Sequence, residues 1–415
     1  MSLTSARKVY ACIQYLQLSS FTIAYKKFTE RRSLMKFIVA PDSFKGSLSS
    51  TCIIDSIKKA GYKIFPDCEM IGVPIADGGE GTLEAIISYA HGEYQQVAVK
   101  NTLGMEIQAK YGVLNQEVAI IEMAEASGLT LIPEDIRNPL NTTTYGTGQL
   151  IEHALSKGYK KIVIAIGGSG TNDGGIGAMA ALGVKFLDKD GVIVEPVGKS
   201  LIKIADIDIT NLHPKLTKAD ITVMCDVNNP LLGPMGATYV YGPQKGGSSE
   251  ILEQLEQGME NYVTVIKKIF QVDISNERGA GAAGGLGAAL MFFTGAKLQS
   301  GISTLLKLIR FEKLLDGADL VITGEGRIDE QSAYGKVPSG IGQLCKEKGV
   351  PVIAIVGGIG KGASTIYDYG VDSILSIVNA PMSLNNAMEH GTELLEDAAE
   401  RLFRVLRVGV MLKKS

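Results

Sequence analysis

The sequence predicts an α/β protein with two domains: a doubly wound, mostly parallel domain of the flavodoxin or Rossmann type, and an inserted mixed α/β domain. Three observations support this fold class. With 415 residues, the chain is too long for one ordinary hydrophobic core. From Met35 onward, short β-branched runs alternate with segments of helical period, which is typical of parallel α/β sheets. Between about residues 95 and 280, short apolar runs separated by turns replace this alternation, so we expect the second domain there.

The doubly wound domain is expected to use both ends of the chain, residues 35–95 and 281–415. Its strands are predicted where β-branched runs occur, at residues 37–40, 70–75, 320–323, 352–356 and 373–378. A helix is expected to begin at Ser49 or Thr51, because a hydroxyl residue there precedes apolar residues at helical spacing. Further helices are expected at about residues 82–90 and 385–405.

The inserted domain is expected to span residues 96–280. Its first three apolar runs are separated by turn signals, which suits an antiparallel sheet; they lie at residues 96–99, 107–113 and 118–122. A helix, a strand and a glycine-rich loop are expected around residues 147–175, and residues 186–193 predict a hairpin with a tight turn. A strand at 221–225 and a long helix at Ser249–Phe270 complete this domain.

The first 34 residues differ from the rest of the chain. They hold six basic residues, one acid and no glycine, whereas Met35 opens directly on an apolar run. We expect residues 1–34 to be an extension outside the fold, from an upstream start or an added segment. An organelle-targeting peptide is the less favoured alternative, since such peptides are also basic and rich in serine.

Composition argues against several classes of partner. A formal charge of −3 gives no electrostatic reason to expect nucleic acid, and no apolar stretch of about 18 residues indicates a membrane span. The five cysteines are scattered and lack metal-ligand spacing, so we expect reduced thiols and a cytoplasmic protein. A homodimer is compatible with these features but is not required by them.

Several mechanisms lack the residues that they need. The four histidines form no metal-like pair. The loop at Gly168–Gly174 has one residue too many for a dinucleotide fingerprint, and the spacing before Gly198-Lys199-Ser200 is wrong for a P-loop. An NAD(P)-linked hydroxy-acid oxidoreductase remains an alternative, because glycine-rich loops follow strands as they do in such enzymes.

Three strand-to-loop junctions combine glycine with acids. They lie at residues 75–82 (sequence IADGGEGT), 166–175 (IGGSGTNDGG) and 322–329 (ITGEGRID). Ligands of open α/β sheets bind at the carboxyl ends of strands, so we expect these junctions to form one site. Phosphoryl transfer suits them, because it needs backbone N–H groups, cations, a base and carboxylates for Mg²⁺. Taken singly, the first junction is better explained as a helix N-terminus. For the third, with Lys336 downstream, a structural ion-pair network is the less favoured alternative.

Three further features are ambiguous when taken singly. Residues 41–47 suit an anion, although Lys45 could equally be a solvated loop lysine. Asp226 and Lys245 follow a strand and a glycine turn, where function and structure explain them equally well. The glycines of Gly279–Gly287 suit either a phosphate cradle or close helix packing.

Together these stretches resemble the type I glycerate kinase family, the bacterial glycerate kinases of glyoxylate and glucarate/galactarate catabolism. The matching segments are residues 38–43, 74–82, 166–169, 171–175, 225–227, 242–246, 279–285 and 322–329. They occur in one order from Met35 to about residue 405, and small departures at Gly170 and Lys45-Gly46 remove no acid or cation. The resemblance implies Mg²⁺- and ATP-dependent phosphorylation of D-glycerate at the 2-hydroxyl, with the 3-hydroxyl as the alternative.

Chemistry then suggests roles for the cations. Glycerate and ATP are both anions, so cations must surround them. We assign Lys45, Lys245 and Arg327 to the binding of glycerate or phosphate. Arg327 best suits a bidentate contact with a carboxylate. Lys45 and Arg327 are counted among the catalytic candidates.

The acids are divided between proton transfer and metal binding. Asp173 and Asp329 are the candidates for base and metal ligand, in an order that the sequence does not fix. Asp77, Glu80 and Asp226 are assigned to Mg²⁺. The other cofactor-binding candidates are Asp42, Ser43, Gly167, Gly168, Ser169, Asn172, Gly281, Gly284, Gly324 and Glu325.

Overall fold

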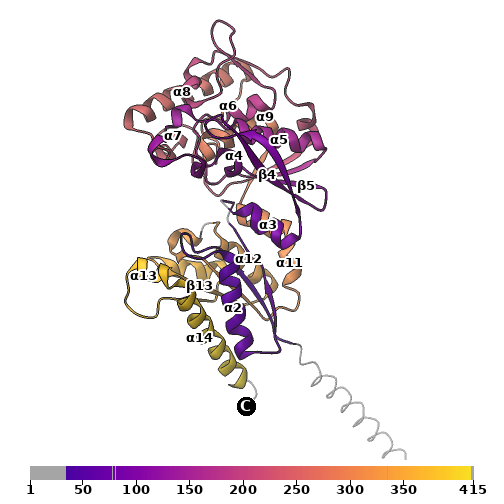
Figure 1. Ribbon diagram of the computed structural model, residues 1–415, viewed down its shortest axis with the longest axis vertical. Helices are drawn as coiled ribbons and strands as arrows, with labels where there is room; N and C mark the ends of the chain where they lie inside the picture. The colour runs from indigo at the N-terminus through magenta and orange to yellow at the C-terminus, as the bar shows by residue number, and fades with distance from the viewer. Residues whose placement is uncertain (1–33, 77, 80, 334, 413–415) are drawn as a thin grey trace, which may run out of the picture.

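The computed structural model describes residues 34–76, 78–79, 81–333 and 335–412 (Figure 1). Within them a five-stranded, all-parallel sheet has the order β15-β13-β11-β1-β2. Its strands are β1 (Lys36–Pro41), β2 (Glu69–Gly72), β11 (Leu320–Gly324), β13 (Val352–Val356) and β15 (Ser373–Ser376). This strand order is that of flavodoxin-like doubly wound sheets, which confirms the predicted fold class.

Helices cover both faces of the five-stranded sheet because its strands alternate their apolar side chains. Phe37 and Val39 of β1 pack against α2 (Ser50–Ile64) and α14 (Gly391–Leu412). Ile38 and Ala40 point to the opposite face. That face carries α10 (Gly301–Leu308), α11 (Phe311–Leu314) and α12 (Val337–Lys348). The result is a three-layer α/β/α sandwich.

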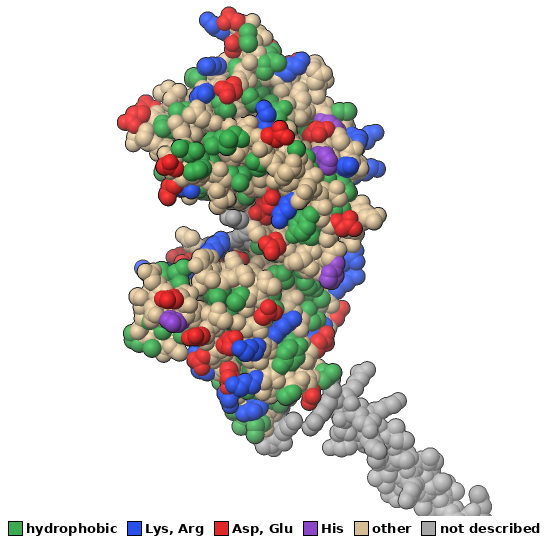
Figure 2. Space-filling model, in the orientation of Figure 1, with side chains coloured by type: hydrophobic (Ala, Val, Ile, Leu, Met, Phe, Trp, Pro, Cys, Tyr) green, Lys and Arg blue, Asp and Glu red, His purple; other side chains and the backbone are tan. Residues whose placement is uncertain are grey.

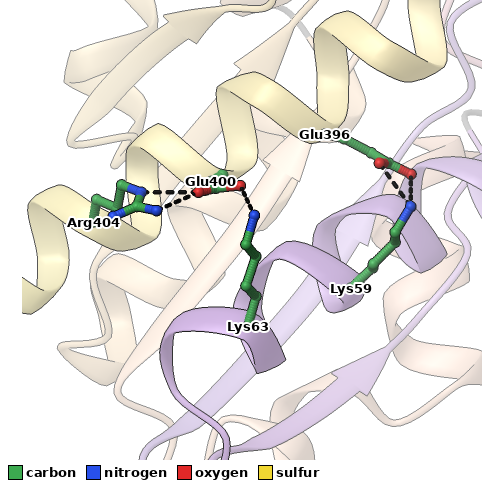
Figure 3. A network of polar contacts seen from close by, with 5 residues as sticks. All are labelled: Lys59, Lys63, Glu396, Glu400 and Arg404. Atoms are coloured by element: carbon green, nitrogen blue, oxygen red, sulfur yellow. Dashed lines mark hydrogen bonds and ion pairs between the residues drawn. The ribbon is translucent and has the colours of Figure 1, made fainter.

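Helices α2 and α14 bring the two ends of the described chain together. Both helices pack on the apolar face of β1, where the ring of Phe37 lies 5.5 Å from that of Phe403 in α14. At the edge of the contact between the two helices, Lys59 pairs with Glu396, and Lys63 with Glu400 (Figure 3). Ion pairs this exposed contribute at most about 1 kcal/mol each, so the apolar contact dominates the docking of α14.

The second sheet has six strands in the order β10-β9-β6-β5-β4-β3. They are β3 (Glu93–Lys100), β4 (Glu106–Leu114), β5 (Val118–Glu122), β6 (Lys161–Ala165), β9 (Asp220–Met224) and β10 (Lys297–Gln299). β3 and β5 pair antiparallel with β4, as predicted, and the other pairs are parallel. Its main helices are α5 (Tyr145–Lys157), α6 (Ile176–Ala181), α8 (Ser249–Phe270) and α9 (Leu286–Thr294); shorter ones are α4 (Ala124–Ser127) and α7 (Ala237–Tyr241).

Helix α3 (Thr82–Ala90) lies between the two sheets (Figure 1). Its residue Ile86 belongs to a hydrophobic cluster that also contains Ile38 of the first sheet and Ile120 of the second. The Glu122 carboxylate at the end of β5 accepts hydrogen bonds from the Gly81 and Leu83 N–H groups at the start of α3. The two sheets are therefore joined by a packed core.

Residues 186–193 form the predicted hairpin around a tight turn, with an antiparallel bridge between Leu187 and Ile193, and β7 (Lys185–Leu187) also pairs with β8 (Asp206–Asp208). Two boundaries differ from the sequence predictions. The last predicted helix is two helices, α13 (Leu384–Glu389) and α14. The domain division stays a prediction, but β10 belongs to the second sheet, which favours a boundary after Gln299 instead of at residue 281.

Two sequence predictions concern the chain as a whole. Residues 1–33 of the expected extension lie outside the described residues. Among the helices that are described, none is both long and apolar enough to span a membrane.

Candidate active site

The first cavity, which we call the switch-point cavity, lies at the carboxyl ends of the parallel strands and has a volume of about 610 Å³. Asp42 and Ser43 follow β1, and Glu325 follows β11. β1 and β11 are the neighbours between which the order of a flavodoxin-like sheet reverses, and ligands bind at that point. Beyond it, an apolar wall is formed by Ile377, Val378, Met382, Leu384, Ala387 and Met388.

The second cavity, which we call the cleft cavity, lies between the two sheets and has a volume of about 670 Å³. Figure 2 shows the molecule hollowed between its two parts. The second sheet contributes Gly167, Gly168 and Ser169 after β6, and Asp226 after β9. Gly78 and Gly79 come from the loop after β2.

Glycine allows the two strand-end loops to meet. The Gly167 N–H donates to the Gly78 carbonyl at 3.2 Å. A Cβ at Gly167 would lie 2.6 Å from the Cα of Gly79, closer than real Cβ contacts come. The first and second junctions that the sequence singled out are therefore in contact, as expected. Asp77 and Glu80 themselves lie outside the described residues.

Two lysines line both cavities, namely Lys45 after β1 and Lys336 at the start of α12. The cavities therefore adjoin at a cationic junction. Lys45 was predicted as a binding residue. Lys336 was not, because the sequence named it only as a residue downstream of the Gly324–Asp329 motif that an ion-pair network could include.

Asp42 and Glu325 form a pair of buried acids at the switch point, 7% and 6% exposed. Burial raises the pKa of Glu325 to about 7; Ser332 and Lys336 act against this, while Asp42 adds to it. Among the residues that the structure describes, none is a hydrogen-bond partner for the buried Oε1 atom of Glu325. A buried carboxylate oxygen that no protein group satisfies, beside a second acid, suits a cation or a donor on a ligand.

Lys245 is the buried cation of the cleft cavity, with 1% of its surface exposed. Its Nζ donates to the Ser169 hydroxyl at 3.3 Å and to the Thr171 carbonyl at 2.5 Å. Burial lowers the pKa of Lys245 to about 7, although the nearby Asp173 carboxylate acts in the opposite direction. An ammonium has three donors, so one N–H remains for an anion in the cavity.

Asp173 does not have the geometry of the predicted base. It is fully buried, and its carboxylate accepts four hydrogen bonds, from the Thr144 N–H, the Thr144 hydroxyl and the N–H groups of Gly175 and Gly177. These bonds fix the glycine-rich loop against the start of α5. Asp173 thus shapes the loop and lines neither the switch-point cavity nor the cleft cavity, so this geometry does not favour it as the base and its predicted role stays untested.

Three glycines that the sequence assigned to cofactor binding lie at points of close packing, and that assignment stays a prediction. A Cβ at Gly281 would lie 2.2 Å from the Pro230 carbonyl, and one at Gly284 would lie 2.1 Å from the Thr171 carbonyl. Gly324 is equally close to the neighbouring strand β13, at the Ile355 carbonyl. Their role is to let backbones approach, which was the alternative that the sequence left open for Gly279–Gly287.

Arg327 and Asp329 pair with each other, with Nε and Oδ2 3.5 Å apart. The Arg327 side chain is 70% exposed and lines the switch-point cavity, so its assignment to ligand binding stays a prediction. Asp329 accepts from the Gln331 N–H and lines neither described cavity. The structure therefore does not favour Asp329 as the base.

The remaining predicted residues divide between the two cavities and the core. Asp226 is exposed in the cleft cavity, where its Oδ1 accepts from the Gly301 N–H at 3.0 Å. Asn172 is buried; its Nδ2 donates to the Thr238 hydroxyl, and its Oδ1 has no hydrogen-bond partner. Among the described residues, no group of three His, Cys, Asp or Glu side chains is placed to hold a metal ion.

Fold and site together define an α/β protein with a cationic cleft at strand ends, suited to small anionic ligands. The family model described as the glycerate kinase family matches residues 37–407, and this chain belongs to that family.

Named relatives and a solved structure agree with this assignment. A glycerate kinase from Halalkalibacterium halodurans is 43% identical over 88% of this chain and 96% of its own length. The Escherichia coli K12 protein named glycerate 2-kinase is also 43% identical, over 91% of this chain and 99% of its own length. A crystal structure of a Salmonella typhimurium LT2 protein assigned as glycerate kinase 2 superposes with a TM-score of 0.81 at 41% identity. The superposition covers 91% of this chain and 100% of the Salmonella chain.

Proposed function

We propose that this chain transfers the γ-phosphoryl group of ATP to the 2-hydroxyl of D-glycerate, giving 2-phosphoglycerate and ADP. Membership of the glycerate kinase family supports the reaction, and the name of the Escherichia coli relative supports the position. The observation that carries the proposal is the junction of two cavities at Lys45 and Lys336. Two anionic substrates need two adjoining spaces with cations where the phosphoryl group passes.

Glycerate binds in the cleft cavity. Its carboxylate accepts the remaining N–H of Lys245, whose burial removes competing water. Ser169 and Thr171 hold that ammonium in place, which fixes the position of the carboxylate before binding. In this arrangement Lys245 takes the role that the sequence suggested for Arg327.

Asp226 is the base in this arrangement, because it is the acid of the cleft cavity among the described residues. Its carboxylate accepts the proton of the glycerate hydroxyl while the new O–P bond forms and the bond from the β,γ-bridging oxygen to the γ-phosphorus breaks. Lys45 and Lys336 stabilise the charge on the transferring group and on the departing ADP.

The residues at the switch point fit Mg²⁺. Asp42 and Glu325 supply two carboxylates, and the unsatisfied Oε1 of Glu325 is a free acceptor. Mg²⁺ in kinases is held by one or two carboxylates and by phosphate oxygens, and it neutralises phosphate charge. Asp77 and Glu80 remain metal candidates from the sequence. A homodimer and a cytoplasmic location also remain predictions.

The test is product analysis with purified protein, D-glycerate and MgATP. Phosphorus NMR should show a phosphate ester at C2 and stoichiometric ADP. An ester at C3 would refute the position but retain the kinase. Absence of any ester, with NAD(P)⁺-dependent absorbance at 340 nm instead, would favour the oxidoreductase alternative.

A further inference from the structure

The apolar wall of the switch-point cavity has no role in handling phosphate or glycerate. Its six side chains are Ile377, Val378, Met382, Leu384, Ala387 and Met388. Leu384 is 73% exposed, although it belongs to a short helix that packs beside α14. Ile377 is buried and the other four are half-buried, so the wall presents a partly exposed apolar surface that a flat apolar ligand group would cover.

Polar and apolar groups are segregated within this cavity. Asp42, Lys45, Glu325 and Lys336 come from the loop after β1 and from the segment after β11, and two of them border the cleft cavity. The apolar wall comes from the segment after β15, at the edge of the sheet. The strands β13 and β11 separate β15 from β1 in the sheet, although the wall ends beside the loop after β1, where the Ser47 hydroxyl donates to the Met388 carbonyl at 3.0 Å.

We propose that the adenosine half of ATP binds against this apolar wall in the switch-point cavity, with its phosphates directed along the sheet edge toward Lys45 and Lys336. The proposal rests on the proposed kinase function and assigns ATP to the five-stranded sheet and glycerate to the cleft. A purine is flat and largely apolar, so it suits the apolar wall. The phosphate chain is anionic, so it suits the end of the cavity that Lys45 and Lys336 line.

Gly358 provides a steric probe of this assignment. It lines the switch-point cavity, its φ is not positive, and a Cβ there would meet no atom within 4 Å. Gly358→Leu therefore adds volume without backbone strain. Neighbouring Gly357 is unsuitable, because its Cβ would lie 2.4 Å from the Gly326 carbonyl. Gly409→Leu is the matched control, since Gly409 also faces open space and lines neither cavity.

The experiment measures binding of MgADP and of magnesium tripolyphosphate by calorimetry, without glycerate. Gly358→Leu should weaken ADP binding at least about tenfold, the usual effect of overfilling a site, and tripolyphosphate binding less than threefold. Gly409→Leu should change neither. Circular dichroism should be unaltered and the melting temperature should not fall in either variant; Gly409→Leu lies in α14 and should raise it slightly.

Each other outcome overturns the assignment. Unchanged ADP affinity in Gly358→Leu would place adenosine elsewhere. An equal loss for ADP and tripolyphosphate would place phosphates against the wall. The readout is independent of turnover: weakened ADP binding in a protein that does not phosphorylate glycerate would sink the proposed substrate alone, while normal ADP binding in an active variant would sink this inference alone.

Discussion

Replacing Lys245 by methionine, and raising the pH around the wild-type protein, should have the same effect on glycerate binding. The ammonium is buried, and burial lowers the pKa of Lys245 from 10.5 to about 7. Only the protonated form can hold a carboxylate in a site that excludes water. Glycerate itself stays ionised above about pH 5, so Lys245 dominates the pH dependence of binding.

The expected rise in the KM for glycerate follows from the fraction of protein in which Lys245 is protonated. At pH 9, two units above the pKa, about 1% of Lys245 carries its proton, and apparent affinity falls in proportion to the competent fraction. The KM for glycerate should therefore rise about 100-fold between pH 6 and pH 9. Lys245→Met should show a high KM at pH 6 that does not change up to pH 9.

The stability of the protein supplies a second readout. It should rise with pH, whereas glycerate binding should weaken. The folded-state pKa lies below that of an exposed lysine, so between about pH 7 and 10.5 the unfolded chain binds more protons and stability rises with pH. Below pH 7 the buried charge carries its full cost, roughly 5 kcal/mol for a shift of three to four units. Lost hydrogen bonds to Ser169 and Thr171 offset part of the gain. Lys245→Met should still raise the melting temperature at pH 6.

The assay is ADP release at saturating MgATP, with coupling enzymes in excess at each pH. The KM for ATP serves as the internal control and should vary little between wild type and Lys245→Met. A wild-type KM for glycerate that stays constant from pH 6 to pH 9 would refute the reasoning. So would a pH dependence that persists in Lys245→Met, because another group would then control binding.

Four further outcomes follow from the placement of the other candidates. In steady-state kinetics, Asp226→Asn should lower kcat by about 10²–10⁴ with an unchanged melting temperature, whereas Asp329→Asn should change kcat only a few fold. A larger loss of kcat in Asp329→Asn than in Asp226→Asn would return the role of base to Asp329. Asp173→Asn should lower the melting temperature, because it disturbs four buried hydrogen bonds at a cost of roughly 1–3 kcal/mol or more; thermal unfolding unaltered by the change would contradict the structural role. Arg327→Lys should raise the KM for ATP more than that for glycerate, since Arg327 lines the switch-point cavity, and a selective effect on glycerate would restore the original assignment. Deleting residues 1–34 should leave kcat and melting temperature unchanged if they are the expected extension, and loss of either would show that they belong to the fold.

Periodicity was sufficient for the architecture of the chain. Alternating apolar runs at residues 37–40 and 320–323 predicted buried parallel strands, and the structure pairs these two segments directly as β1 and β11. Helix α8 begins and ends where its apolar spacing predicted. Secondary structure follows local patterns because hydrogen bonds within helices and the pleat of strands act between near neighbours.

The roles of the acids were not available from local pattern. Asp173 and Glu325 both stand beside glycines at strand ends, and both are buried. Asp173 accepts four protein hydrogen bonds, one pair of them from Thr144, which lies on another element. Glu325 retains an unsatisfied oxygen. Whether an acid is satisfied depends on donors from distant segments, which spacing within a motif does not encode.

The sequence by itself determined the fold class, the family resemblance and the presence of glycine- and acid-rich loops at strand ends. Only the tertiary structure placed Lys45 and Lys336 where the two cavities adjoin, buried Lys245 in the wall of the cleft cavity, and left an apolar wall after β15. The physical reason is that a loop motif fixes which groups are offered, whereas burial, pKa and cavity shape arise from contacts between segments far apart in the chain.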